Sequence, residues 1–184
     1  ACMLRAAVDA YEIYQEKEIS DEIYFDTMKC FPRFIKETYE MTGRLSFDRY
    51  WWTTRQVGCH LFRIGELEYE IKRIDHDVVI SVHIPSDADL SPLAVEKSLY
   101  DAHEFFLEKY PSLSDIEYCC HSWLLDVQLK GMLGKNSNII SFQNLFEIYD
   151  EGGIFLGLNK YNRSVAILDI FDSDKYANAN GCIY

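Results

Sequence analysis

The chain has 184 residues, of which 48% are apolar and 26% are charged, a balance typical of an ordinary globular protein. Its net charge of −12 argues against a nucleic acid or an anionic membrane as partner, because little positive surface is left to replace the counterions of phosphate groups. No apolar run approaches the roughly 20 residues that span a bilayer, so we expect neither a membrane span nor a secretory signal.

The six cysteines favour a reducing, cytoplasmic compartment. Cys119 and Cys120 are adjacent, and the others are far apart without CxxC spacing, so the sequence indicates no disulfide framework. The pair Cys119 and His121 comes nearest to the ligand spacing of a structural zinc site, and it is a weak match. We therefore expect core thiols and no bound metal.

The first third of the chain predicts helices. Residues 1–17 lack Gly and Pro and space their apolar side chains at helical intervals. Ser20 is placed to cap a second helix, followed by acidic residues that suit a first turn. Pro32 should interrupt or restart that helix, and Gly43 is a suitable stop.

A third short helix should be capped by Ser46, carry the aromatic residues 50–52 and end at Gly58. Aromatic side chains at this density indicate a helical layer that packs on a sheet. The sequence thus divides into a helical segment, residues 1–58, and a mixed domain, residues 59–184, in which strands and helices alternate.

After residue 59 the apolar period becomes that of strands. Apolar residues occupy even positions before Gly65 and odd positions after it, which predicts a hairpin or bulge at this glycine. Residues 77–85 predict a strand rich in β-branched side chains. A long helix should start at the pair Ser91 and Pro92 and end before Pro111.

The remaining elements are shorter. Residues 115–123 predict a strand, 124–134 a short helix, 137–145 a further helical turn and 146–151 a strand. Residues 163–172 fit a strand or a short helix, and their periodicity does not decide between them. The fold class expected from this order is α+β, with a mixed β-sheet flanked by helices.

Two histidines stand at the ends of neighbouring strands. The strand, helix and strand over residues 77–123 form a crossover unit, so the two strands should be parallel. His83 and His121 then lie near their carboxyl ends, where ligands of open α/β sheets bind. An imidazole exchanges protons near neutral pH, and the Ser122 hydroxyl or the Cys119 thiol could act beside it. The alternative is two structural histidines that are hydrogen-bonded in place.

Other groups have simpler interpretations. Glu66, Glu68 and Glu70 alternate along one strand face, which is typical of a solvated face rather than of a metal site. Trp51, Trp52 and Trp123 are interpreted as core or domain-interface residues.

Three stretches resemble a known family. "VHIPSDADLSP", "CCHSWLLD" and "NSNIISFQNLFEI", together with the upstream run that starts at "DTMKCFPRFIKETYEMTG", are similar to the C-terminal GNAT-like domain of bacterial acyltransferase-domain proteins. The resemblance runs from about residue 19 to residue 148, and "HIP" and "CHSWLL" are its most specific parts. It implies a mixed sheet whose central parallel strands splay apart to admit acyl-CoA, and an N-terminal acyltransferase-type domain in the same longer protein.

The resemblance also implies roles for residues. His83 and His121 would flank the splay, and one of them would deprotonate the acceptor of the acyl group. The loop that the family uses for the CoA pyrophosphate corresponds to the residues that follow the first of these strands: Ile84, Ser86, Asp87, Leu90 and Ser91.

Two other interpretations stay open. The loop 86–91 lacks the Q/R-x-x-G-x-G/A pattern of the wider superfamily and carries two carboxylates, which favours a GNAT-like module that binds or regulates without catalysis. A metal-dependent hydrolase that uses His83, His121 and a carboxylate is the remaining alternative.

Overall fold

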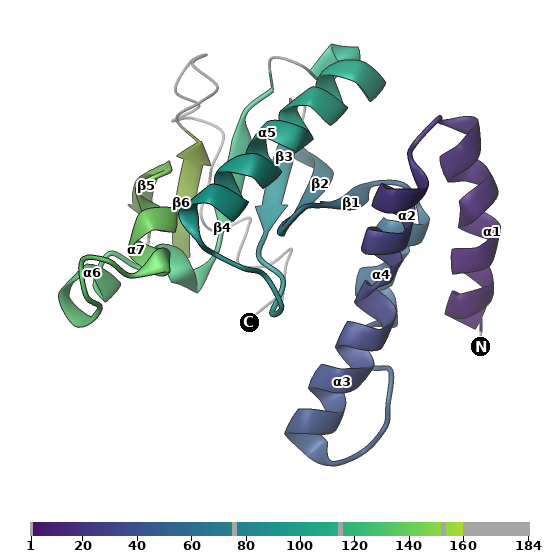
Figure 1. Cartoon of the computed structure of the whole chain (residues 1–184), viewed down its shortest axis with the longest axis horizontal. Coiled ribbons are helices and arrows are strands. Elements are labelled where there is room, and N and C mark those ends of the chain that lie inside the picture. The colour runs from purple at the N-terminus through teal and green to yellow at the C-terminus, as the bar shows by residue number, and fades with distance from the viewer. Residues whose placement is uncertain (1, 75–76, 114–115, 152–153, 160–184) are drawn as a thin grey trace.

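The computed structural model describes residues 2–74, 77–113, 116–151 and 154–159, so the element expected at 163–172 lies outside the described residues. Four helices precede a mixed sheet, with further helices between the later strands (Figure 1). The first helices are α1 (Cys2–Glu16), α2 (Asp21–Met28), α3 (Cys30–Thr42) and α4 (Tyr50–Val57). This arrangement confirms the predicted α+β class with a helical N-terminal segment.

The N-terminal helices begin and end largely where the sequence predicts. The Ser20 hydroxyl accepts a hydrogen bond from the backbone N–H of Ile23 at 3.3 Å and so caps α2. Pro32 lies in the first turn of α3, where its missing N–H costs no helical hydrogen bond. Gly43 ends α3 at φ 69°. The cap predicted at Ser46 is wrong, because α4 starts after Arg49, which makes no side-chain capping bond.

The sheet has six strands in the order β1-β2-β3-β4-β6-β5. Only the pair β3 and β4 is parallel among these described strands. Their bounds are β1 (Leu61–Ile64), β2 (Leu67–Ile74), β3 (Asp77–His83), β4 (Tyr118–His121), β5 (Phe146–Glu151) and β6 (Ile154–Asn159). The parallel crossover is confirmed, whereas β6, which lies between β4 and β5, was not predicted.

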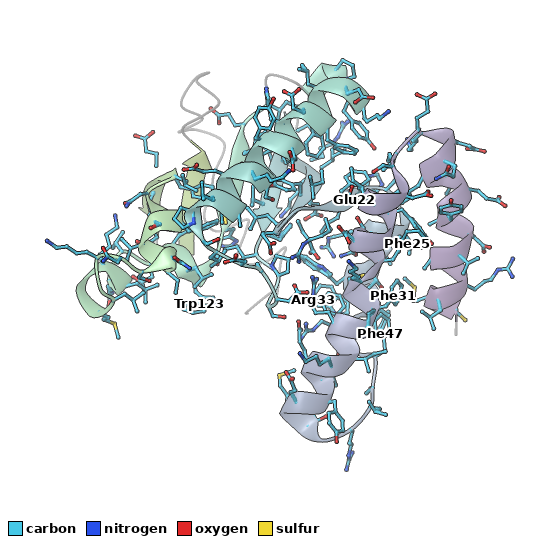
Figure 2. The ribbon with its side chains drawn as sticks, in the orientation of Figure 1. Glu22, Phe25, Phe31, Arg33, Phe47 and Trp123 are labelled. Carbon is cyan, nitrogen blue, oxygen red and sulfur yellow. The ribbon has the colours of Figure 1, made fainter. Side chains whose placement is uncertain are left out.

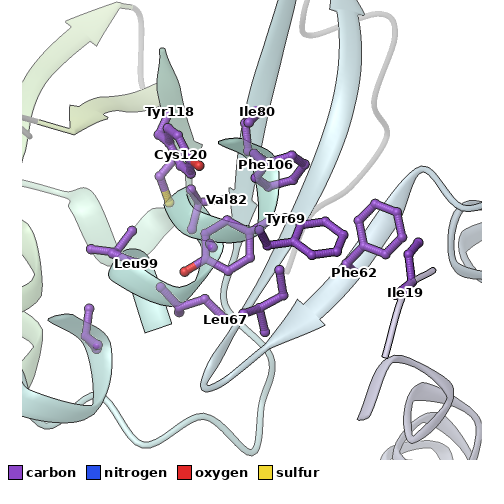
Figure 3. Close-up of a cluster of buried hydrophobic side chains, with 14 of the residues drawn as sticks. Ile19, Phe62, Leu67, Tyr69, Ile80, Val82, Leu99, Phe106, Tyr118 and Cys120 are labelled. Carbon is purple, nitrogen blue, oxygen red and sulfur yellow. The ribbon is translucent and has the colours of Figure 1, made fainter. Parts of the chain in front are cut away.

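One face of the sheet packs against the long helix α5 (Pro92–Lys109) and forms the main core (Figure 3). Side chains reach this core at every second strand position: Phe62, Leu67, Tyr69, Ile80, Val82, Tyr118 and Cys120. Phe106 of α5 is 1% exposed and packs among these rings. Burial of one such side chain stabilises a fold by roughly 1.5–3 kcal/mol, so this face accounts for much of the stability.

The turn between β1 and β2 is the hairpin predicted at Gly65. Its φ is 62°, a conformation that suits glycine, and a Cβ here would lie 3.0 Å from the Cβ of Ser98. The Ser98 hydroxyl accepts a hydrogen bond from the backbone N–H of Leu67 at 3.2 Å and lies 2.9 Å from the Tyr69 hydroxyl. The hairpin is thereby fixed against α5.

Short helices connect β4 to β5. After β4 come η2 (Trp123–Leu125), α6 (Leu129–Met132) and α7 (Asn138–Gln143), and the single-turn η1 (Pro111–Leu113) follows α5. The helix expected over 124–134 is therefore divided into two pieces. Buried Gln143 donates to the carbonyls of Leu124 at 2.8 Å and Asp126 at 2.9 Å, which fixes η2 against α7. Among the described helices, none is both long and apolar enough to cross a bilayer.

Candidate active site

The two candidate histidines end the two parallel strands. The last paired residues of β3 and β4 are Val82 and Cys120, and His83 and His121 follow them directly. The Val82 and Cys120 side chains lie in the core beneath α5, so by strand alternation the two imidazoles lie on the opposite face. The structure therefore places His83 and His121 side by side at one sheet edge.

His83 is held by residues from β2 and α4. Its Nε2 lies 2.9 Å from Oε2 of Glu70. The Nε of Arg55 donates to the other carboxylate oxygen, Oε1 of Glu70, at 2.8 Å. Trp52 closes the arrangement, because its ring meets the His83 ring edge-on at 5.0 Å and lies 4.2 Å from the Arg55 guanidinium. We call these four residues, His83, Glu70, Arg55 and Trp52, the histidine cluster.

The charge of Glu70 fixes the tautomer of His83. Burial alone would raise the pKa of Glu70, but hydrogen bonds and charges from His83 and Arg55 outweigh it, and the net pKa is lowered. An ionised carboxylate only accepts hydrogen bonds, so Nε2 of His83 must carry the hydrogen. In a neutral His83 this leaves Nδ1 to accept a proton.

His121 has a different environment. It is exposed at the end of β4, and partial desolvation of its ring, together with the charges of Lys72 and His83, lowers its pKa. His121 is therefore neutral at neutral pH. The charge of His83 acts on the His121 ring, as expected of two side chains that end neighbouring strands.

The glutamates of β2 are not solvated as the sequence suggested. Glu68 is 3% exposed and Glu70 is 8% exposed. Arg33 of α3 donates to Oε1 of Glu68 at 2.6 Å, and Figure 2 shows Arg33 on the sheet side of α3, with Phe31 and Phe47 on its other side. The expectation of a solvated face is thus wrong, since α3 and α4 cover these carboxylates with arginines.

The thiols of Cys119 and Cys120 are packed in the fold, and the Ser122 hydroxyl caps a helix. Burial raises the pKa of Cys119 to about 11, and that of Cys120 is raised as well, so both stay protonated near neutral pH. Cys30 and Cys59 are also buried free thiols, which confirms the predicted core role for these cysteines. The Ser122 hydroxyl accepts a hydrogen bond from the backbone N–H of Leu124 at 3.2 Å and caps η2. Ser122 thus follows His121 directly but serves the next turn.

The loop after β3 contacts both sides of the fold. The carboxylate of Asp87 accepts from Arg63 at 3.0 Å and from Arg33 at 3.4 Å, and Ser86 donates to Glu37. Ile84 is half-buried against the core. Ser86 and Asp87 are therefore engaged with α3 and β1 rather than with the start of α5.

Leu90 and Ser91 lie on the other side of this loop. The Ser91 hydroxyl and backbone N–H donate to the carboxylate of Asp89 at 2.9 and 2.8 Å, at the N-cap of α5. Leu90 lines a pocket of about 210 Å³ between the start of α5 and the end of α7. The other lining residues are Pro92, Val95, Glu96, Ser141, Phe142, Asn144 and Leu145. Of the five loop residues expected at a cofactor, Leu90 is the one that lines this pocket.

Sequence reasoning missed three members of the histidine cluster. It assigned Glu70 to a solvated face, placed Trp52 in a core or interface, and gave Arg55 no role. Strands β2 and β3 pair antiparallel, with Glu70 opposite Ser81 and Glu68 opposite His83. This register is the signal that could have placed the two glutamates beside His83. Trp52 is buried as predicted, whereas Trp51 and Trp123 are exposed, and Trp123 lies apart from Arg33 (Figure 2).

No metal cluster is present in this site. Across the described residues, no group of three or more His, Cys, Asp or Glu side chains is arranged to hold a metal ion. An imidazole that is held by a carboxylate, as His83 is by Glu70, can accept and return a proton.

Comparison with known proteins gives two family matches. Residues 61–179 match the model of the GNAT-like C-terminal domain, and residues 1–59 match that of the N-acyltransferase N-terminal domain. The histidine cluster therefore combines Trp52 and Arg55 from the second match with Glu70 and His83 from the first. A comparison with curated proteins gives no match.

Solved structures resemble the chain over most of its length. An acyltransferase in complex with decanoyl-CoA and teicoplanin is 26% identical, with a TM-score of 0.77, over 82% of this chain and 47% of that chain. An acyltransferase in complex with CoA and 10C-teicoplanin is 25% identical, with a TM-score of 0.76 and the same coverage. The chain thus spans about half the length of the acyltransferases that it matches.

Proposed function

We propose that this chain, which belongs to the GNAT-like C-terminal domain family, takes part in transferring an acyl group from an acyl-CoA to an amine or a similar small nucleophile. The observation that carries the proposal is the bond between Nε2 of His83 and Glu70 at the end of a parallel strand pair. The acyl-CoA ligands of two similar acyltransferase structures support the choice of donor.

The reaction is a direct attack on the thioester. The acceptor nitrogen forms a bond to the acyl carbon while the carbon–sulfur bond breaks, and CoA leaves as a thiolate. Nδ1 of His83 takes the proton that the nitrogen loses, and Glu70 stabilises the imidazolium that forms. The proton then passes to the thiolate, which balances the step.

The proposed entry for acyl-CoA is the pocket between α5 and α7. Its lining is apolar at Leu90, Val95, Phe142 and Leu145, as suits a pantetheine or an acyl chain. It lies at the loop that follows β3, on the α5 side, and the ladder between β3 and β4 ends at Val82 and Cys120. The thioester would pass between the strand ends to reach His83 on the opposite face.

Binding and turnover test this function separately. Isothermal titration calorimetry of the complete protein, with its proposed N-terminal domain, should show binding of CoA and of decanoyl-CoA below millimolar concentration. Teicoplanin, a ligand of one similar structure, is the first acceptor to try, with acylation followed by mass spectrometry. We expect His83→Gln to lower turnover about 10²–10⁴-fold at unchanged CoA affinity. His121→Ala shows whether the second imidazole shares the role, and no CoA binding at millimolar ligand would exclude the donor.

A second candidate is a GNAT-like module that binds or regulates without catalysis. The observation in its favour is the charge at the start of α5, where Asp89 and Glu96 would repel a pyrophosphate and Asp87 occupies Arg33 and Arg63. A turnover assay that follows the release of CoA thiol from an acyl-CoA separates the two candidates, because a module of this kind would release none in the presence of any amine.

The setting of the chain is part of the proposal. We propose as partner an N-terminal domain of the same longer protein, supported by the greater length of the similar acyltransferases, and we keep the division at residues 58 and 59 as a prediction. A cytoplasmic location is supported by the free thiols of the five cysteines that the described residues include. The charge of −12 supports a small-molecule acceptor rather than a nucleic acid or a membrane.

A further inference from the structure

We propose that Arg55, on α4, is a positioning residue that sets the proton affinity of His83 through Glu70. The inference rests on the role proposed above for His83 as the base. It goes further because Arg55 lies in the segment matched by the N-terminal domain family, whereas Glu70 and His83 lie in the segment matched by the C-terminal one. The base would then be adjusted by a residue from the neighbouring family segment.

The side chain of Arg55 is held by contacts with Glu70 and Trp52. Its Nε donates to Oε1 of Glu70 at 2.8 Å, and its guanidinium lies 4.2 Å from the Trp52 ring. The side chain of Glu70 is 11% exposed, so its charge is weakly screened by water. Because each oxygen of Glu70 has one cationic or imidazole partner, Arg55 and His83 compete for a single negative charge.

The other charged groups that face His83 are largely balanced. Glu68 lies opposite His83 in the antiparallel ladder, and Arg33 neutralises it at 2.6 Å. His121 stands at the end of the next strand, and the charge of Lys72 acts on that imidazole. Glu70 is thus the carboxylate that contacts His83, and Arg55 is the cation on its other oxygen.

The sign of the effect follows from this competition. Arg55 shares the negative charge of Glu70 with His83 and repels an imidazolium at the same carboxylate. Removing Arg55 leaves the full charge of Glu70 to His83 and should raise the pKa of His83. Removing the charge of Glu70 takes away the stabilising anion and should lower the pKa of His83.

Proton NMR titration of the five histidines in the free protein measures this directly, with His83 assigned by its loss in His83→Gln. We expect Arg55→Gln to raise the pKa of His83 by about 1 unit and Glu70→Gln to lower it by about 1 unit. In the Glu70→Gln background, Arg55→Gln should shift the pKa much less. The control Arg5→Gln removes an exposed arginine on α1 that pairs with Asp9, and it should leave the pKa unchanged.

Three results would overturn the inference: no shift in Arg55→Gln, a downward shift, or an equal shift in both backgrounds, which would mean that Arg55 does not act through Glu70. Arg55→Met removes the charge but keeps a long side chain for contact with Trp52, and it serves where Arg55→Gln does not fold. An upward shift in Arg55→Met supports the inference, and an unchanged or lowered pKa contradicts it.

The two proposals fail in different ways. The titration needs no acyl donor, so the expected shifts without any acyl transfer would remove the proposed function and leave the control of His83 by Arg55 in place. Acyl transfer without the pKa shifts would remove the control of His83 by Arg55 and leave the proposed function in place. Where both hold, the acidic limb of the pH–rate profile should move upward in Arg55→Gln and downward in Glu70→Gln.

Discussion

The two faces of strand β2 differ more than their shared backbone suggests. Leu67 and Tyr69 point toward α5 and join an apolar core, whereas Glu68 and Glu70 point to the other face and are buried too. The first face is filled by rings and aliphatic side chains, and the second by charges that arginines neutralise. Burial in this protein therefore does not distinguish the core from the site, but the chemistry of the partners does.

The difference separates two kinds of stabilisation. On the α5 face, apolar contacts stabilise the fold roughly in proportion to the apolar area that they remove from water. On the opposite face, each carboxylate loses hydration, and its arginine restores a part of that loss, so the net gain is small while the loss of one partner is costly. The fold depends on the first face, and the proposed chemistry depends on the second.

The largest effect is expected on the α5 face. Phe106→Ala removes a ring that is 1% exposed and should lower the free energy of unfolding by about 3–5 kcal/mol, because the cavity cannot fully collapse. Chemical denaturation measures the change. Leu107→Ala, at the next position and 46% exposed, is the matched control and should cost less than about 1 kcal/mol. Equal losses in the two variants would contradict the assignment of this face as the core.

A smaller effect is expected on the charged face. Glu68→Gln leaves the Arg33 guanidinium buried with a neutral acceptor and should cost about 2 kcal/mol. Asp9→Asn, which removes the partner of exposed Arg5, should change the stability by less than about 0.5 kcal/mol. If the two variants are equally stable in denaturation, the buried pair contributes no more than a surface pair.

The smallest effect concerns pH. The pKa of Glu70 is lower in the folded chain than its ordinary value of 4.5, so its ionisation stabilises the fold above that value and the contribution is lost as the pH falls through the folded pKa. The difference in unfolding free energy between the natural chain and Glu70→Gln should therefore narrow below pH 4.5. Thermal unfolding at a series of acidic pH values measures this difference. A difference that widens as the pH falls would contradict the prediction.

The α5 face could be predicted because its signals are local. Alternation on each side of Gly65 and the helical spacing of Val95, Leu99 and Phe106 indicate which side chains turn inward, and the structure buries them. The crossover between the two parallel strands predicts that His83 and His121 lie at one end of the sheet, as they do. Period and connectivity were sufficient for these features.

The charged face could not be predicted, because its partners are distant in the sequence. Arg33 precedes Glu68 by 35 residues and Arg55 precedes Glu70 by 15, and both arginines come from helices whose placement the sequence does not reveal. Alternating glutamates on a strand look solvated until those helices are placed. Strand β6 was missed for a related reason, since its short run "IFLGLN" has weak alternation and gains its partners only in the sheet.

The order of the last strands has a consequence for synthesis on the ribosome. Strand β4 pairs with β3 on one side and with β6 on the other, and β5 is made before β6. Until Asn159 has left the ribosome, the second edge of β4 therefore stays open to other chains, as an unpaired strand edge does. The nascent chain carries this unprotected edge while some 38 residues beyond His121 are being added, about 2–8 s at roughly 5–20 residues per second.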